Sequence, residues 1–147
     1  MSFTLERYPS NKKPKPIVTP RKNIAWESKA VFNPCVIYDG GRFKMLYRTY
    51  PHTLTNGEPR LKRPGFYFKN QISRIGYAES TDGITFKRRV APFISPSETY
   101  DQYGCEDPRI TKIGDTFYIS YTAIDGPIDD RDHKPNVRIA LATTQDF

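Results

Sequence analysis

Two adjacent acids and an arginine stand where a hydrophobic run begins in the segment GCEDPRITKIGDTFYISYTA, residues 104–123. Carboxylates are poor strand formers, and they cost free energy when they are buried without a partner. A carboxylic acid can donate a proton to a leaving group, and an arginine can bind an anion. Glu106, Asp107 and Arg109 are therefore candidate site residues. An ion pair between Asp107 and Arg109 that only fixes the end of a strand explains the same residue types.

The segment is also the second copy of an internal repeat. Residues 33–49 align without a gap with residues 107–123, at a constant offset of 74 positions, and the identical pairs are Pro34 and Pro108, Phe43 and Phe117, and Tyr47 and Tyr121. Asn33 and Asp107 are equivalent, and each directly precedes a proline. Because a residue before proline is pushed towards extended conformations, we expect a stiff, extended backbone at both positions.

Strand alternation predicts which neighbours of Asp107 share its face. Side chains at positions i and i+2 of a strand point to the same side, and those at i and i+1 point to opposite sides. We therefore expect Asp107 and Arg109 to face the same way and Glu106 to face the other way.

Short runs rich in Val, Ile, Tyr, Phe and Thr, separated by turn residues such as DGG and TDG, indicate antiparallel hairpins. The proline-rich start of the chain predicts an extended arm over residues 1–24, which leaves residues 25–147 for the folded part. The expected strands cover residues 30–38, 42–50, 73–80, 84–89, 109–113, 116–123 and 136–144.

The repeat continues into the third strand, because RIGYAESTD (residues 74–82) resembles RIALATTQD (residues 138–146). Four-stranded antiparallel sheets repeated along a chain are typical of β-propeller blades. We therefore predict an all-β fold in which this chain covers about the first two blades of a longer propeller. A β-sandwich of two such sheets is the alternative, although packing alone does not demand the sequence details that the repeat preserves.

Composition bounds the function classes. The chain has 147 residues, 37% of them hydrophobic, with a net charge of +7. It lacks a signal-like or membrane-spanning apolar stretch, so we expect a cytoplasmic protein with no membrane partner. Cys35 and Cys105 lack CxxC spacing and are expected to be reduced thiols. A propeller that binds nucleic acid rests on the net charge alone, and we expect no such partner.

No metal or nucleophile motif stands out. The acidic stretch at residues 125–136 lacks the register and closing glutamate of a calcium loop. The two histidines, His52 and His133, do not accompany a serine or cysteine in a nucleophile turn. We therefore expect neither a metal nor an organic cofactor.

Several segments together resemble the N-terminal portion of glycoside hydrolase family 130, the β-mannoside phosphorylases and hydrolases. The likeness runs in order through WESKAVFNPCVIYDGGRFKMLYR, SRIGYAESTDGITF, GCEDPRITKIGDTFYISYTA and RIALATTQDF. The resemblance implies a five-bladed β-propeller with Asp107 as the catalytic acid, acting through a hydroxyl of the bound mannose. It also implies that the substrate-binding residues are Asn33, Arg48, Ser73, Glu106 and Arg109.

The activity implied by the resemblance is an inverting phosphorylase that releases mannose 1-phosphate, with inorganic phosphate as co-substrate. The expected types act on β-1,4-mannooligosaccharides or on mannosyl-glucose. The alternatives are a β-mannoside hydrolase of the same family and a non-catalytic carbohydrate-binding propeller. The residues that decide between phosphorolysis and hydrolysis are expected beyond Phe147, so the isolated chain is expected to be inactive. The insert at residues 51–70 lies outside the family pattern and is expected to shape the entrance or a homo-oligomer contact.

A proton donor imposes one condition on Arg109. A tight pair between Arg109 and Asp107 would favour the charged carboxylate, which cannot donate a proton. If Asp107 is the acid, we expect Arg109 to be turned towards Glu106, the sugar or the phosphate.

Overall fold

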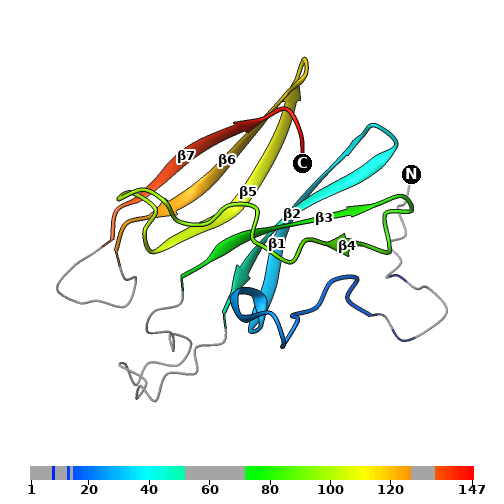
Figure 1. The fold of residues 1–147 in the computed structure, drawn as a ribbon, viewed down its shortest axis with the longest axis horizontal. Coiled ribbons are helices and arrows are strands. Elements are labelled where there is room, and N and C mark those ends of the chain that lie inside the picture. Colours follow the sequence, from blue (N-terminus) through cyan, green and yellow to red (C-terminus); the bar gives the residue numbers. More distant parts are fainter. Residues whose placement is uncertain (1–7, 9–12, 14, 52–71, 127–134) are drawn as a thin grey trace, which may run out of the picture.

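A computed structural model describes residues 8, 13, 15–51, 72–126 and 135–147. Two antiparallel sheets lie face to face in it (Figure 1). The first has the strand order β1 (Ala30–Asp39), β2 (Arg42–Tyr50), β3 (Arg74–Ser80) and β4 (Lys87–Arg88). The second has the order β5 (Gly104–Ile113), β6 (Thr116–Ile124) and β7 (Val137–Thr144), and a short 3-10 turn, η1 (Ala25–Glu27), precedes the first sheet.

The strands follow the predicted runs closely, with two differences. β5 begins at Gly104 rather than at residue 109, so the two acids lie inside the strand. The fourth strand, expected over residues 84–89, is reduced to Lys87–Arg88. Its first half is lost because the Asp82 carboxylate accepts hydrogen bonds from the backbone N–H groups of Ile84 and Thr85, at 2.8 and 2.7 Å. This local turn competes with the sheet ladder for the same donors.

The repeat in the sequence is a repeat in the backbone. β1 and β2 are joined through Gly40 and Gly41, and β5 and β6 through Gly114 and Asp115. Gly40 and Gly114 are 74 positions apart, and both have a φ of 58°. Glycine adopts this left-handed conformation without the clash that a Cβ atom brings, which suits a tight hairpin turn. Both hairpin turns point to the top of Figure 1.

The main core lies between the two sheets. Leu46, Ile75 and Tyr77 of the first sheet pack against Cys105, Ile119, Tyr121 and Ala123 of the second. The inward residues of β6 are 119, 121 and 123, as strand alternation requires. A smaller cluster of Met45, Tyr47 and Ala78 lies on the other face of the first sheet, where Val18 of the N-terminal segment also packs.

A buried tyrosine in each sheet donates a hydrogen bond to a buried carboxylate from the segment that precedes the sheet. Tyr47 donates to Glu27 at 3.0 Å, and Tyr121 donates to Asp101 at 3.0 Å. The two acids are 74 positions apart, as the two tyrosines are, and their exposed fractions are 0% and 1%. The repeat therefore extends upstream of the aligned segments, to Glu27 and Asp101.

The prediction of an all-β fold with antiparallel hairpins is confirmed. Within the described residues, none of the helical structure is long or apolar enough to cross a membrane. Cys35 and Cys105 are free thiols. Burial raises the pKa of both, and the neighbouring Asp101 carboxylate adds to the effect at Cys105. The boundary between an arm at residues 1–24 and the folded part stays a prediction.

Candidate active site

Asn33 and Asp107 occupy two matching irregularities in the sheets. In β1 the register with β2 skips between Phe32 and Cys35, and in β5 the register with β6 skips between Glu106 and Arg109. Asn33 has a φ of 47° and Asp107 a φ of 49°, and they are the two non-glycine residues with positive φ in the described part of the chain. Asn and Asp tolerate this region better than other side chains. Strained backbone of this kind concentrates at functional sites.

These bulges correct two predictions. The backbone before each proline is not extended, since both residues have positive φ. The alternation rule is also wrong here, because a bulge places two residues of one strand opposite one residue of its partner. Glu106 and Asp107 therefore both contact Arg48, where regular alternation predicts opposite directions. The alternative explanation, an ion pair between the carboxylate of Asp107 and Arg109, does not hold, because the carboxylate pairs with Arg48.

Asp107 receives two donors on one oxygen. Asn33 Nδ2 donates to Asp107 Oδ1 at 2.7 Å, and Arg48 Nη1 donates to the same oxygen at 3.3 Å. Among the described residues, no hydrogen bond is made to Oδ2, and 35% of the side chain is exposed. Because Oδ1 must accept from two N–H groups, a proton carried by Asp107 resides on Oδ2. One carboxylate oxygen of Asp107 is therefore held by the protein, and the other is available to a bound ligand.

Glu106 lies beside Asp107 but in a different environment. Its Oε1 accepts hydrogen bonds from Arg48 Nη2 at 2.6 Å, from the Ser73 hydroxyl at 2.9 Å and from the Tyr50 hydroxyl at 3.0 Å. Glu106 is 6% exposed and Ser73 is fully buried. Burial and the Glu106 charge raise the pKa of Tyr50, so its hydroxyl keeps its proton. The Glu106 side chain is therefore held in place by three donors to one oxygen.

Arg48 connects the two acids. Its guanidinium carbon lies 4.8 Å from the ring centres of both Phe32 and Tyr50, so its position is fixed by aromatic rings as well as by the two carboxylates. Its Nε is the one buried side-chain nitrogen or oxygen without a hydrogen-bond partner in the part of the chain that the structure describes. The two Nη atoms make the hydrogen bonds of Arg48, which go to the two acids and, from Nη2, also to the Tyr50 hydroxyl.

Arg109 does not pair with the Asp107 carboxylate, but it turns to backbone carbonyls and not to Glu106 as expected. Its Nη1 donates to the backbone carbonyl of Pro108 at 2.8 Å and makes a long contact of 3.5 Å with the carbonyl of Asp107. The residue is exposed. Arg109 borders the site and leaves the Asp107 carboxylate to Asn33 and Arg48.

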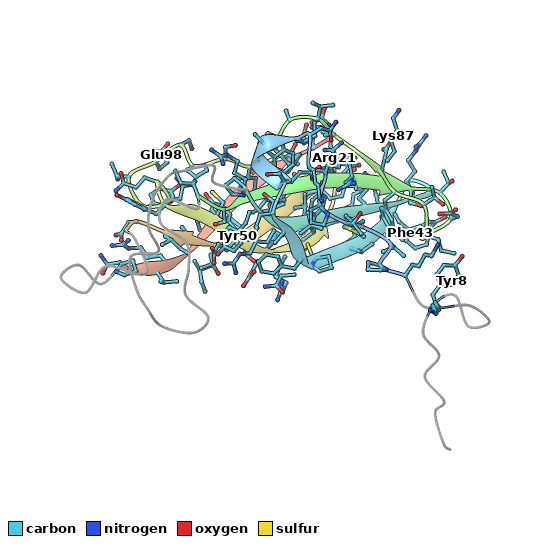
Figure 2. The ribbon with its side chains drawn as sticks, turned by 90° about the horizontal axis from the view of Figure 1, so that it is seen from below. Tyr8, Arg21, Phe43, Tyr50, Lys87 and Glu98 are labelled. Carbon is cyan, nitrogen blue, oxygen red and sulfur yellow. The ribbon has the colours of Figure 1, made fainter. Side chains whose placement is uncertain are left out.

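The structure thus brings together five of the six predicted site residues, Asn33, Arg48, Ser73, Glu106 and Asp107. Sequence reasoning missed Tyr50 and Phe32. Tyr50 follows Arg48 by two positions on β2, and Phe32 is directly opposite Arg48 in the register, so period-two alternation and cross-strand pairing could have indicated both. Figure 2 shows Tyr50 and Phe43 at opposite ends of β2, with Tyr50 at the end where the site lies and Phe43 near the hairpin turn.

Other predictions fall outside the site. His52, His133 and most of the acidic stretch lie outside the described residues, as does nearly all of the insert at residues 51–70. Within that stretch, Asp125 bonds Asn136 and Arg138 and closes a loop. The Arg138 and Asn136 donors hold the pKa of Asp125 at about 2. Across the described ranges, no group of three His, Cys, Asp or Glu side chains is placed to hold a metal ion.

Comparison with known proteins identifies the family. The model of glycoside hydrolase family 130, described as beta-1,4-mannooligosaccharide phosphorylase, matches residues 65–147. A 1,2-beta-oligomannan phosphorylase from Thermoanaerobacter sp. (strain X514) is 38% identical over 133 residues, which are 90% of this chain and 40% of that protein. A beta-1,2-mannobiose phosphorylase from the same organism is 41% identical over 114 residues, which are 76% of this chain and 36% of that protein.

A solved structure shows the same arrangement of strands. A glycosyl hydrolase from Bacteroides ovatus has a TM-score of 0.69 and 30% sequence identity, covering 98% of this chain and 39% of that chain. The chain spans 40% and 36% of the length of the two curated relatives named above. The expected propeller, and not the sandwich, is confirmed. On the family match and the shared fold, the chain belongs to glycoside hydrolase family 130, and its two sheets are part of that family's β-propeller.

Proposed function

We propose that the protein is a phosphorylase of β-1,2-linked mannosides in which Asp107 is the proton donor. The observation that carries the proposal is the environment of the Asp107 carboxylate, with Oδ1 held by Asn33 and Arg48 and Oδ2 without a hydrogen bond to any described residue. The preference for the β-1,2 linkage rests on the names of the two curated relatives. The β-1,4 linkage in the description of the family model is the alternative.

The proposed reaction needs one acid from this part of the protein. A phosphate oxygen forms a bond to the anomeric carbon as the bond from that carbon to the glycosidic oxygen breaks, so the configuration inverts. The leaving oxygen takes up a proton that Asp107 Oδ2 supplies, directly or through a hydroxyl of the mannose. Since phosphate is already an anionic nucleophile, no carboxylate is needed to activate it. An inverting hydrolase, by contrast, needs a second carboxylate about 6.5–9.5 Å from the acid to activate water.

Glu106 is poorly suited to be that second carboxylate. It is nearly buried, and its Oε1 accepts three hydrogen bonds. A general base must contact the water that it deprotonates. Among the described residues, the site therefore holds an acid without a suitable base, and the preference for phosphorolysis rests on the names of the two curated relatives.

The proposal is tested on the full-length protein with β-1,2-mannobiose and β-1,4-mannobiose, each with and without inorganic phosphate. We expect mannose 1-phosphate from the β-1,2 substrate, only when phosphate is present. Free mannose released at the same rate without phosphate would identify a hydrolase. Binding of the disaccharide without either product would instead identify a carbohydrate-binding propeller.

A further inference from the structure

We propose that Glu106 is a positioning residue that holds the Arg48 guanidinium and thereby prevents a two-pronged ion pair between Arg48 and Asp107. The inference rests on the proposed function, because it matters only if Asp107 has to carry a proton. It also gives Glu106 a role through Arg48, in place of the direct substrate contact expected from the sequence.

The two Nη atoms of the Arg48 guanidinium contact different acids. Nη2 lies 2.6 Å from Glu106 Oε1, whereas Nη1 lies 3.3 Å from Asp107 Oδ1. Arginine and carboxylate prefer two parallel hydrogen bonds, which Asp107 does not obtain because Nη2 is committed to Glu106. The shorter contact is with the buried acid and the longer one with the exposed acid. Glu106 therefore takes the larger share of the charge of Arg48.

Glu106 is itself fixed from the neighbouring sheet. Ser73 lies next to Gly104 in an isolated parallel bridge, and the Cys105 N–H donates to the Ser73 carbonyl at 3.1 Å. A Cβ atom on Gly104 would lie 2.2 Å from Ser73 Oγ, so only glycine leaves room for that hydroxyl to donate to Glu106. Tyr50 adds a second hydroxyl donor from β2. The hydrogen bonds to Glu106 thus connect β5 to β2 and to the residue just before β3, across the two sheets.

The arrangement is specific to one copy of the repeat. The residue equivalent to Glu106 in the first copy is Phe32, whose ring lies against the Arg48 guanidinium. The acid and the aromatic ring therefore hold the same cation from two related strands. A carboxylate at this position is not required by the fold, since the first copy forms the same bulge with phenylalanine there.

The Glu106→Gln variant removes the charge and keeps the shape. The glutamine oxygen can still accept from Nη2, but it carries no charge, so the Asp107 carboxylate then competes for Arg48 without a rival anion at position 106. This favours the charged form of Asp107 and opposes proton donation. The charged or titratable groups around Glu106 and Arg48 are Arg48 itself and Tyr50 on β2, Arg74 on β3, and Cys105, Asp107 and Arg109 on β5. The Glu106→Gln change leaves all six of these groups in place.

The kinetic test measures kcat and KM of the full-length protein from pH 5 to 9 with β-1,2-mannobiose and phosphate. For Glu106→Gln we expect kcat at pH 7 to fall about 10-fold with little change in KM, and the alkaline limb of the profile to move about one pH unit lower. The matched control is Glu79→Gln, because Glu79 pairs with Arg42 on the same sheet, with both side chains partly exposed. The profile of that control should equal the wild-type profile.

Two results would overturn the inference: an unchanged profile shape with uniformly lower activity, or a raised KM with kcat unchanged, which indicates direct substrate contact. If Glu106→Gln does not fold, as judged by circular dichroism, Ser73→Ala and Tyr50→Phe each remove one of its anchors and should move the limb in the same direction. A crystal structure of any of these variants tests the inference without an activity measurement, because it shows the hydrogen bonds of Arg48. Arg48 should make two hydrogen bonds to Asp107, and an unmoved Arg48 would contradict the inference even if the wild-type protein proved inactive on mannosides.

Discussion

The two copies of the repeat share a backbone and differ in chemistry. Each bends its first strand at a bulge and turns a non-glycine residue to positive φ directly before a proline. The first copy places Asn33 there and the second places Asp107. The two side chains then meet across the sheets, and the amide of one donates to the carboxylate of the other at 2.7 Å. The fold therefore presents a polar side chain in the same way twice, and under the proposed function the choice of Asn or Asp decides which copy supplies the proton.

The strands that follow the two bulged strands, β2 and β6, also carry different side chains at equivalent positions. Arg48 of the first copy corresponds to Thr122 of the second, and Tyr50 corresponds to Ile124. The first copy thus contributes the cation and the hydroxyl, and the second contributes both acids. Neither sheet alone contains the site, which explains why the catalytic geometry depends on how the two sheets pack.

Exchanging the two bulge residues tests the difference between the copies most strongly, and we expect it to have the largest effect on activity. In the double variant Asn33→Asp, Asp107→Asn the acid moves to the first copy, away from the oxygen position set by Arg48. We expect kcat on β-1,2-mannobiose to fall by about 10²–10⁴, the range that a general acid supplies. The measurement is single-turnover formation of mannose 1-phosphate, with the melting temperature as a control for folding. Near wild-type activity would mean that either copy can present the acid.

Neutralising the buried carboxylates Glu27 and Asp101 should give the next largest effect, a loss of stability. Glu27 pairs with Arg21 and Arg88, whereas the described partners of Asp101 are the N–H groups of Ser97 and Glu98, Tyr121 and Cys105. Removing one partner of a buried ion pair leaves uncompensated charge, so Glu27→Gln should lower the free energy of unfolding by about 3 kcal/mol. Asp101→Asn should lower it by about 1–2 kcal/mol, since it weakens hydrogen bonds only. Urea unfolding of the two variants measures the difference, and a larger loss for Asp101→Asn would contradict the assigned roles.

The hairpin glycines should give the smallest and most equal effects. Gly40 and Gly114 have the same φ of 58°, and a Cβ atom at either position would meet no atom within 4 Å. Alanine therefore costs only the left-handed backbone conformation, about 1 kcal/mol at each position. Thermal unfolding of Gly40→Ala and Gly114→Ala should give matching losses. A clear difference would show that the two turns are not equivalent.

Much of this arrangement is predictable from the sequence. Hairpin turns and alternation located the strands, and the offset of 74 positions paired Asn33 with Asp107. The bulge was not predictable, because period-two reasoning assumes a regular register and one inserted residue reverses it. Regular alternation therefore predicted that Asp107 and Arg109 share a face and that Glu106 faces the other way, whereas Glu106 and Asp107 both contact Arg48. Asn and Asp at matching positions were a usable signal, since these two residues tolerate positive φ.

The role of Asp107 is tested most directly by changing what the leaving group needs. A sugar leaving group requires a proton, whereas 2,4-dinitrophenolate leaves without one. For Asp107→Ala in the full-length protein with phosphate, we predict a loss of kcat of about 100-fold or more on β-1,2-mannobiose and a far smaller loss on 2,4-dinitrophenyl β-mannoside. Equal losses on the two substrates, or no loss on mannobiose, would contradict the assignment of Asp107 as the proton donor.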